Sequence, residues 1–117
     1  MSMILFVLHD AEKLQAVLDA WEEAGISGAT VLFSTGIGRI RESQALRDDL
    51  PIMPSLEDFY ALPERLGRTI FTITDDESLV DKIVRATESV VGDLNEPNRG
   101  ILTVLPTTGI YGLRKTA

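Results

Sequence analysis

Residues 3–8 form an unbroken apolar run, and this run constrains the fold more than any other feature of the sequence. Six residues are too few for a helix of ordinary length, so the run predicts a β-strand. Successive side chains of a strand point to opposite faces of its sheet, and Met3, Leu5 and Val7 are as apolar as the residues between them. We therefore expect this strand to be buried on both faces.

Two later segments carry the periodicity of amphipathic helices. Apolar side chains recur at i, i+3, i+4 and i+7 over residues 14–21, with Asp10 as a candidate N-cap before them and Gly25 as a stop after them. A second apolar stripe covers residues 80–94 and follows the acidic and capping residues 75–78. The spacing therefore predicts two helices.

Three further segments, 30–35, 68–74 and 101–105, have the composition and patterning of strands. Residues 107–117 form a tail in which we expect a short edge strand. Between the second and third strands, residues 36–67 hold three of the five prolines and show little periodicity. A loop of this length inside a domain is unusual and tends to be functional, and we expect part of it to be mobile.

The order strand, helix, strand, long loop, strand, helix, strand predicts an α+β fold of the ferredoxin-like βαββαβ type. Such a fold has a four-stranded antiparallel sheet with both helices on one face. The whole chain, residues 1–117, is predicted to be a single domain. Because residues 3–8 are also apolar on the helix-free side, a second copy of the chain is the simplest cover, and we expect an oligomer.

Composition narrows the classes of function. Eleven Lys and Arg against eighteen Asp and Glu give a net charge of −7, which disfavours binding to nucleic acid. With no cysteine and one histidine, the chain is poorly equipped for a metal site or a nucleophilic triad, and we expect neither a metal site nor an enzyme. No apolar run approaches the ~18 residues of a membrane span, so we expect a cytoplasmic chain without direct membrane insertion.

Residues 36–39, Gly-Ile-Gly-Arg, are the first candidate binding motif. Gly36 and Gly38 follow the second predicted strand, where glycines let backbone N–H groups approach a bound anion closely. Arg39 adds a positive charge beside them. The motif lacks the third glycine of a dinucleotide fingerprint and the helix that follows it, so it predicts a small-anion site, with an ordinary strand-ending turn as the alternative.

A second turn-rich segment, residues 95–100, joins the second predicted helix to the fourth strand. It contains Asn98, Arg99 and Gly100. In a ferredoxin-like unit this segment and the chain after the second strand both lie near sheet ends, and in an oligomer they can meet across a subunit boundary. Arg39, Arg99 and Arg114 then surround one cleft, which predicts a phosphate site.

Several short phrases, taken in order over essentially the whole chain, resemble those of the PII nitrogen-regulatory proteins. They are residues 28–31 and 36–39, the long loop, and residues 101–106. Residues 92–97, 100–102 and 111–113 are more similar to a divergent PII-like branch than to the central nitrogen sensors. The resemblance implies a homotrimer whose clefts between subunits bind adenine nucleotides, here ATP, ADP or AMP. It also implies that the loop, residues 40–67, presses into a regulated partner such as a transporter or an enzyme.

The resemblance carries over to particular residues and fails at others. Thr30, Gly36, Gly38 and Arg39 match family positions at the nucleotide cleft, and Arg114 matches the second of two arginines that contact phosphates.

The departures lie at the phosphate and magnesium contacts. Gly112 replaces the first of the two family arginines, and Ile40 replaces the glutamine that helps to hold magnesium and 2-oxoglutarate. Residues 97–100, Pro-Asn-Arg-Gly, replace the family's phosphate loop, so Arg99 has to substitute for its lysine.

Residues and resemblance together predict a non-enzymatic, trimeric PII-like signalling protein. It senses a small anionic ligand, requires no cofactor, and controls a partner protein through its long loop. Three alternatives stay open. They are a CutA-type cation-tolerance protein, a small ferredoxin-like enzyme with a carboxylate base, and a structural oligomerisation module without a ligand.

Overall fold

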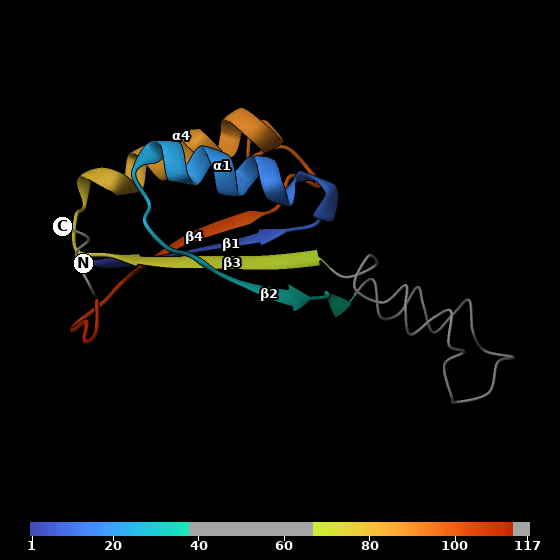
Figure 1. Cartoon of the computed structure of the whole chain (residues 1–117). Coiled ribbons are helices and arrows are strands. Elements are labelled where there is room, and N and C mark those ends of the chain that lie inside the picture. Colours follow the sequence, from blue (N-terminus) through green and yellow to red (C-terminus); the bar gives the residue numbers. More distant parts are fainter. Residues whose placement is uncertain (38–66, 114–117) are drawn as a thin grey trace, which may run out of the picture.

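The computed structural model of the chain describes residues 1–37 and 67–113 (Figure 1). Its elements in chain order are β1 (Ser2–Leu8), the 3₁₀ turn η1 (Ala11–Lys13), α1 (Leu14–Ala24), β2 (Thr30–Ser34), β3 (Gly67–Thr74), α4 (Ser78–Val91) and β4 (Ile101–Pro106). Both predicted helices and all four predicted core strands are present. The helix α4 ends before Leu94, because Gly92 leaves the helical conformation with φ 91° and ψ −169°.

The tail after β4 differs from the prediction. Residues 107–113 form no strand, and Gly112 has φ 85°, which is incompatible with extended backbone. Tyr111 in this tail is 97% exposed. The expected short edge strand is therefore absent from the described part of the tail.

The four strands form one antiparallel sheet in the order β2-β3-β1-β4. The strand β1 lies between β3 and β4, so Leu5 is paired with Phe71 on one side and with Thr103 on the other. Each strand–helix–strand unit is split, because a strand of the other unit lies between its two strands. The predicted α+β class, with a four-stranded antiparallel sheet, is confirmed.

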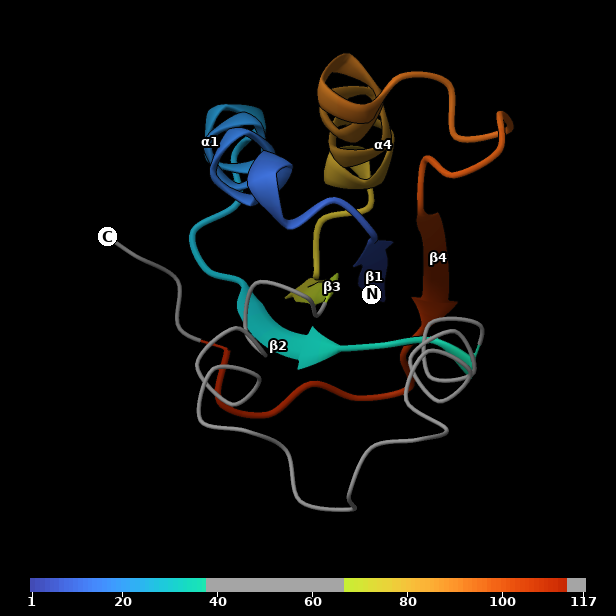
Figure 2. The same cartoon turned by 90° about the vertical axis from the view of Figure 1, so that its right-hand side faces the viewer.

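The two helices lie side by side on one face of the sheet (Figures 1 and 2). Burial alternates along β1, and its side chains at positions 4, 6 and 8 are buried beneath the helices. The buried apolar cluster consists of Ile4, Phe6, Leu8, Val17, Trp21, Ile26, Ile70, Ile83 and Val91. Full burial of a large apolar side chain contributes about 1.5–3 kcal/mol, so this cluster is the main source of stability within one chain.

A buried hydrogen bond joins the two helices inside this cluster. The indole Nε1–H of Trp21 donates to the Thr87 hydroxyl at 2.9 Å, and that hydroxyl donates to the backbone carbonyl of Ile83 at 2.7 Å. Trp21 is 1% exposed and Thr87 is fully buried. The pair therefore fixes α1 against α4 and leaves the indole N–H satisfied in an apolar environment.

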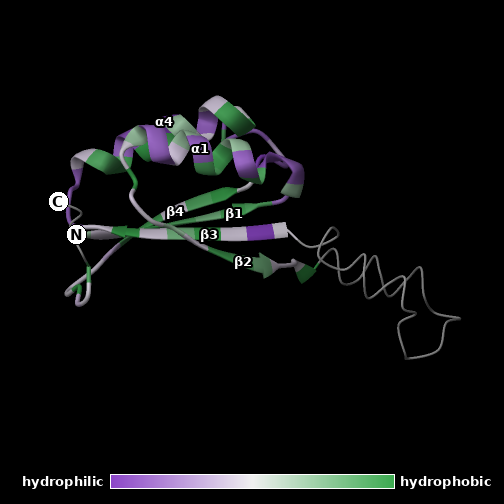
Figure 3. Cartoon of the chain, viewed as in Figure 1, coloured by the Kyte–Doolittle hydropathy of each residue, from purple (hydrophilic) through white to green (hydrophobic). Residues whose placement is uncertain are grey.

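The opposite face of the sheet carries no helix (Figure 1), and the ribbons of β1, β2 and β4 are coloured mainly as hydrophobic (Figure 3). The strand registers place three rows of side chains across this face. The middle row is Thr103–Leu5–Phe71–Thr30, and the rows on its two sides are Leu105–Met3–Ile73 and Ile101–Val7–Thr69–Leu32. Leu32 is 51% exposed and Ile101 is 62% exposed. We call the residues of these three rows the bare face. None of them is charged, although the chain carries a net charge of −7.

Replacing Thr87 with Val tests the buried link between the helices. The variant keeps the side-chain volume but leaves the Trp21 N–H without its acceptor, so the free energy of unfolding should fall by about 1–3 kcal/mol. Urea denaturation measures this change, with Ser89→Ala as the control. Ser89 is exposed on the same helix and its hydroxyl donates to a carbonyl within that helix, so the control should change stability by less than about 0.5 kcal/mol. Equal effects of the two variants would contradict a stabilising role for the Trp21–Thr87 bond.

Candidate functional site

The predicted ligand residues divide between the described and the undescribed parts of the chain. Those that the structure describes are Thr30, Gly36, Asn98, Arg99 and Gly100. Those outside the described residues are Gly38, Arg39 and Arg114, together with nearly all of the predicted partner-binding loop, residues 40–67.

Gly36 and Gly100 lie at the same end of the sheet, where β1 and β2 finish and β3 and β4 begin. At Gly100 the backbone has φ 108°, and a Cβ atom there would lie 2.5 Å from the Val7 carbonyl oxygen and 2.7 Å from the Phe6 ring. Only glycine fits this approach between β4 and β1. The predicted ligand residue Gly100 therefore has a packing role of its own, whereas a Cβ at Gly36 would have open space around it.

The Arg99 side chain turns back onto the end of α4. Its Nη1 donates to the backbone carbonyl of Val91 at 3.2 Å. The guanidinium lies against Gly92, where a Cβ atom would be 3.4 Å from the Arg99 Cζ. Arg99 as a residue is nevertheless exposed, and its bond to Val91 uses one of the five N–H donors of the guanidinium.

The loop between α4 and β4 is held by carboxylates that the sequence did not single out. The Glu88 side chain accepts from the backbone N–H of Leu94 at 3.1 Å, and the Asp93 side chain accepts from the N–H of Asn95 at 2.9 Å. Asn98 in this loop has φ 63°, a conformation that asparagine tolerates better than most residues. The position of Arg99 is thus set by a structured turn and by the end of α4.

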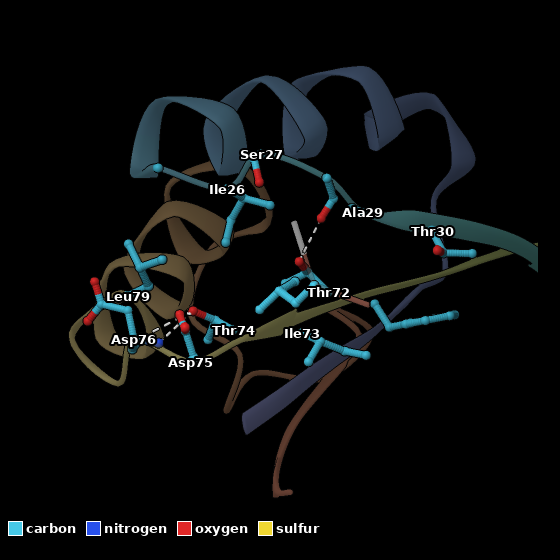
Figure 4. A pocket seen from close by; sticks show the side chains of 14 residues that line it. Ile26, Ser27, Ala29, Thr30, Thr72, Ile73, Thr74, Asp75, Asp76 and Leu79 are labelled. Carbon is cyan, nitrogen blue, oxygen red and sulfur yellow. Dashed lines mark hydrogen bonds between the residues drawn. The ribbon is translucent and has the colours of Figure 1, made fainter. Parts of the chain in front are cut away.

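Thr30 lies away from this sheet end, beside an open hollow of about 970 Å³ (Figure 4). The hollow is lined by residues 25–30 after α1, residues 71–76 at the end of β3, Leu79 of α4 and Leu113 of the tail. The Thr72 hydroxyl donates to the Gly28 carbonyl at 2.6 Å and ties two of these walls together. No sequence motif predicted the hollow, because segments from distant parts of the chain form it.

The hollow combines apolar walls with hydroxyls and carboxylates. Phe71 and Ile73 supply apolar surface, and Thr30 supplies a hydroxyl beside them. The tail crosses from β4 toward the β2 side of the sheet (Figure 2), where Leu113 joins the lining. Asp75 and Asp76 lie in the same lining, so the side of the hollow near α4 is acidic and unfavourable for a phosphate.

Asp76 also caps the start of α4. Its Oδ1 accepts from the Ser78 hydroxyl at 2.6 Å and from the Ser78 backbone N–H at 3.0 Å. These two hydrogen bonds, the hydroxyl bond first, hold the pKa of the Asp76 carboxyl below its ordinary value near 3.8. Among the predicted capping residues 75–78, Asp76 accepts a hydrogen bond from the helix backbone through its side chain.

The predicted ligand residues that the structure describes therefore form two groups within one chain. Gly36, Arg99 and Gly100 belong to one end of the sheet, and Thr30 with the hollow lies toward the other. Thr30 and Ser34 are the two ends of β2, which are about 13 Å apart for a strand rising about 3.3 Å per residue. A single small ligand on one chain cannot contact Thr30 and Arg99 together unless it is long enough to span the sheet.

One cation at the Gly36 end was not included in the predicted site. The Arg68 guanidinium stacks on the Phe33 ring, 4.4 Å from its centroid. Phe33 is 63% exposed, so the pair lies at the surface of the β2–β3 edge. The sequence gave no signal for this stacking, because Phe33 and Arg68 lie on neighbouring strands that are far apart along the chain.

Comparison with known family models and with curated proteins gave no match. Among residues 1–37 and 67–113, no three His, Cys, Asp or Glu side chains converge as metal ligands would. No helix in the same ranges has the length and apolar character needed to cross a membrane. Function has to be inferred from the two groups of ligand residues and from the bare face.

The capping bond to Asp76 predicts a pH dependence. Because the pKa of this carboxyl is lowered on folding, its stabilising contribution is complete above pH ~4 and is lost as the pH falls through the lowered pKa. Ser78→Ala removes the hydroxyl donor, so NMR titration should show the Asp76 pKa rising toward its ordinary value. Ser27→Ala, at an exposed serine in the lining of the hollow, should leave it unchanged. An Asp76 pKa that is the same in wild type and Ser78→Ala would show that the hydroxyl bond does not stabilise the carboxylate.

Proposed function

We propose that this chain is a non-enzymatic PII-like signalling protein that assembles as a homotrimer and holds an adenine nucleotide between neighbouring subunits. Nucleotide occupancy then controls a partner protein, a transporter or an enzyme, through residues 40–67. The observation that carries the proposal is the bare face together with the separation of the ligand residues into two groups at different ends of the sheet.

The bare face supports self-association. Its residues include Leu32, Ile73, Ile101 and Leu105, which are large, apolar and between 38% and 62% exposed in one chain. An apolar surface of this kind on a folded chain is a site for contact with another molecule. Copies of a chain with net charge −7 repel one another, and the uncharged bare face is where they approach with the least electrostatic cost.

The separation of the ligand residues supports a site shared by two subunits. A nucleotide has a phosphate end, which suits the exposed guanidinium of Arg99, and a nucleoside end, which suits a hollow lined by Phe71, Ile73 and the Thr30 hydroxyl. In the proposed trimer, Arg99 of one copy faces the hollow of its neighbour. Arg39 and Arg114, which lie outside the described residues, are proposed to complete the phosphate contacts.

Signalling would work by a shift of populations. The nucleotide binds one arrangement of residues 36–39 better than the others and so favours one conformation of the adjoining loop, and the partner binds that conformation. The free energy available for this control is the difference in nucleotide affinity between the two loop conformations.

A structural oligomerisation module without a ligand is the second candidate. It is favoured by the local roles of Arg99 and Gly100, because the cap on Val91 and the close approach to Val7 account for both residues without any ligand. In that case the bare face would still bring copies together, and nucleotides would not stabilise the protein.

The assembly is tested by light scattering. Wild type should have about three times the monomer mass of 12.8 kDa at micromolar concentration. Leu5→Asp places a carboxylate in the centre of the bare face, where burial is costly, so this variant should dissociate or precipitate. Ser89→Asp adds the same charge on the exposed side of α4 and should leave the mass unchanged. A stable wild-type monomer would rule out the trimer.

The nucleotide site is tested by titration with ATP, ADP and AMP. Wild type should gain thermal stability, by about 2.7 kcal/mol at a ligand concentration of 100 times Kd. Arg39→Ala, Arg99→Ala and Arg114→Ala should each weaken binding tenfold to a hundredfold, because a charge-assisted hydrogen bond contributes about 1.5–3 kcal/mol. Arg47→Ala is the control for bulk charge and should change affinity little. Equal losses at all four arginines, or no binding by wild type, would refute the proposed site.

A further inference from the structure

The end of α4 and the guanidinium of Arg99 form one local unit. The last carbonyls of a helix have no partner within the helix, and Arg99 Nη1 supplies one to the Val91 carbonyl at 3.2 Å. The partial negative charge at a helix C-terminus also favours a cation there. The guanidinium is therefore held at a defined place instead of ranging over the surface as a long side chain usually does.

Gly92 provides the space that this arrangement needs. Its φ of 91° lies in a region that side-chain-bearing residues rarely adopt, and a Cβ atom would approach the Arg99 Cζ to 3.4 Å. The turn is closed from the other side by Glu88, whose backbone carbonyl accepts from the Gly92 N–H at 2.9 Å and whose side chain accepts from the Leu94 N–H. The guanidinium is thus held in place by the backbone of α4 and of the turn after it.

We propose that the C-terminal end of α4 positions Arg99 for the phosphate of the ligand, so that one guanidinium caps Val91 and binds phosphate at the same time. This inference rests on the proposed nucleotide-binding function. A guanidinium has five N–H donors in a planar fork, and the described bond uses one of them. The other donors of the guanidinium can donate to two oxygens of a phosphate while the bond to the Val91 carbonyl is kept.

Two consequences follow from this shared use of Arg99. A lysine at position 99 carries the same charge but lacks the planar fork, so it cannot hold a carbonyl and a phosphate in fixed relative positions. Phosphate bound to Arg99 also makes the guanidinium less mobile, so the last turn of α4 should open less often. Gly92 and Glu88 are positioning residues in this scheme, and neither touches the ligand.

The test combines ATP affinity with amide hydrogen exchange measured by NMR on the full-length protein. In wild type, saturating ATP should slow exchange of the Gly92 and Leu94 amides at least about fivefold more than exchange of the Ile26 amide. The Ile26 N–H closes the end of α1 on the Trp21 carbonyl and serves as the internal reference for general stabilisation. Arg99→Lys should lose about tenfold in ATP affinity and should lose the extra protection at Gly92 and Leu94.

Arg85→Ala is the matched control, since it removes a cation from an exposed position of α4 away from its C-terminal turn. It should bind ATP as wild type does and keep the extra protection. Gly92→Ala is expected to displace the guanidinium and lower ATP affinity, and Arg99→Lys gives an independent measurement if the Gly92 variant folds poorly.

Each remaining outcome decides between the two proposals. If wild type binds ATP but Gly92 and Leu94 gain no extra protection, or lose it, Arg99 leaves Val91 on binding and the shared use is wrong, while the nucleotide site stands. If Arg99→Lys binds as tightly as wild type, the planar fork is not required and the shared use is again wrong. If wild type does not bind ATP, the nucleotide site itself is wrong, and this inference fails with it.

Discussion

The strand β1 needs an apolar layer on each of its faces, and the helices of its own chain supply only one of these layers. Its position between β3 and β4 follows from this requirement, since a central strand has neighbours on both sides as well as layers above and below. The helix layer is closed by the apolar cluster and by the bond from Trp21 to Thr87. The bare face lacks such a layer within one chain, and in the proposed trimer other copies of the chain cover it.

In the proposed site, two residues each have both a structural and a ligand-binding role. The sequence predicts Arg99 and Gly100 as ligand residues, and the structure gives each a local role as well, in the cap on Val91 and in the close approach to Val7. The two roles are compatible in both residues. The cap on Val91 occupies one of the five donors of Arg99, and the close approach to Val7 requires only that Gly100 has no side chain. A loop that is already ordered by Glu88 and Asp93 binds with less loss of conformational entropy than a loop that has to be ordered by its ligand.

The elements could be predicted from the sequence because their signals are local. Gly25 ends α1 with φ 114°, as its position after the apolar stripe indicated. Asp10 accepts the N–H of Glu12 and so caps the 3₁₀ turn η1 that leads into α1, whereas the sequence predicted a cap on the helix itself. The hollow could not be predicted, since residues 25–30 and 71–76 are far apart along the chain and meet through tertiary contacts, the Thr30–Phe71 pairing and the bond from Thr72 to Gly28. The bond from Arg99 to Val91 depends on the backbone of Gly92, and glycine in a sequence does not reveal which unusual φ it adopts. In the described part of the tail, residues 107–113, the expected edge strand is absent for the same reason, at Gly112.

The bond between Trp21 and Thr87 also makes Trp21 an intrinsic fluorescent probe of the packing between the two helices. Trp21 is the single tryptophan, and its indole lies 1% exposed between the two helices. Tyr111, by contrast, is almost fully in water. Because the emission of an indole depends on its hydrogen bonding and on the polarity around it, the tryptophan emission of this protein, excited selectively over tyrosine, reports the packing of α1 on α4. A rearrangement that reached the last turns of α4 would therefore be visible without any attached label.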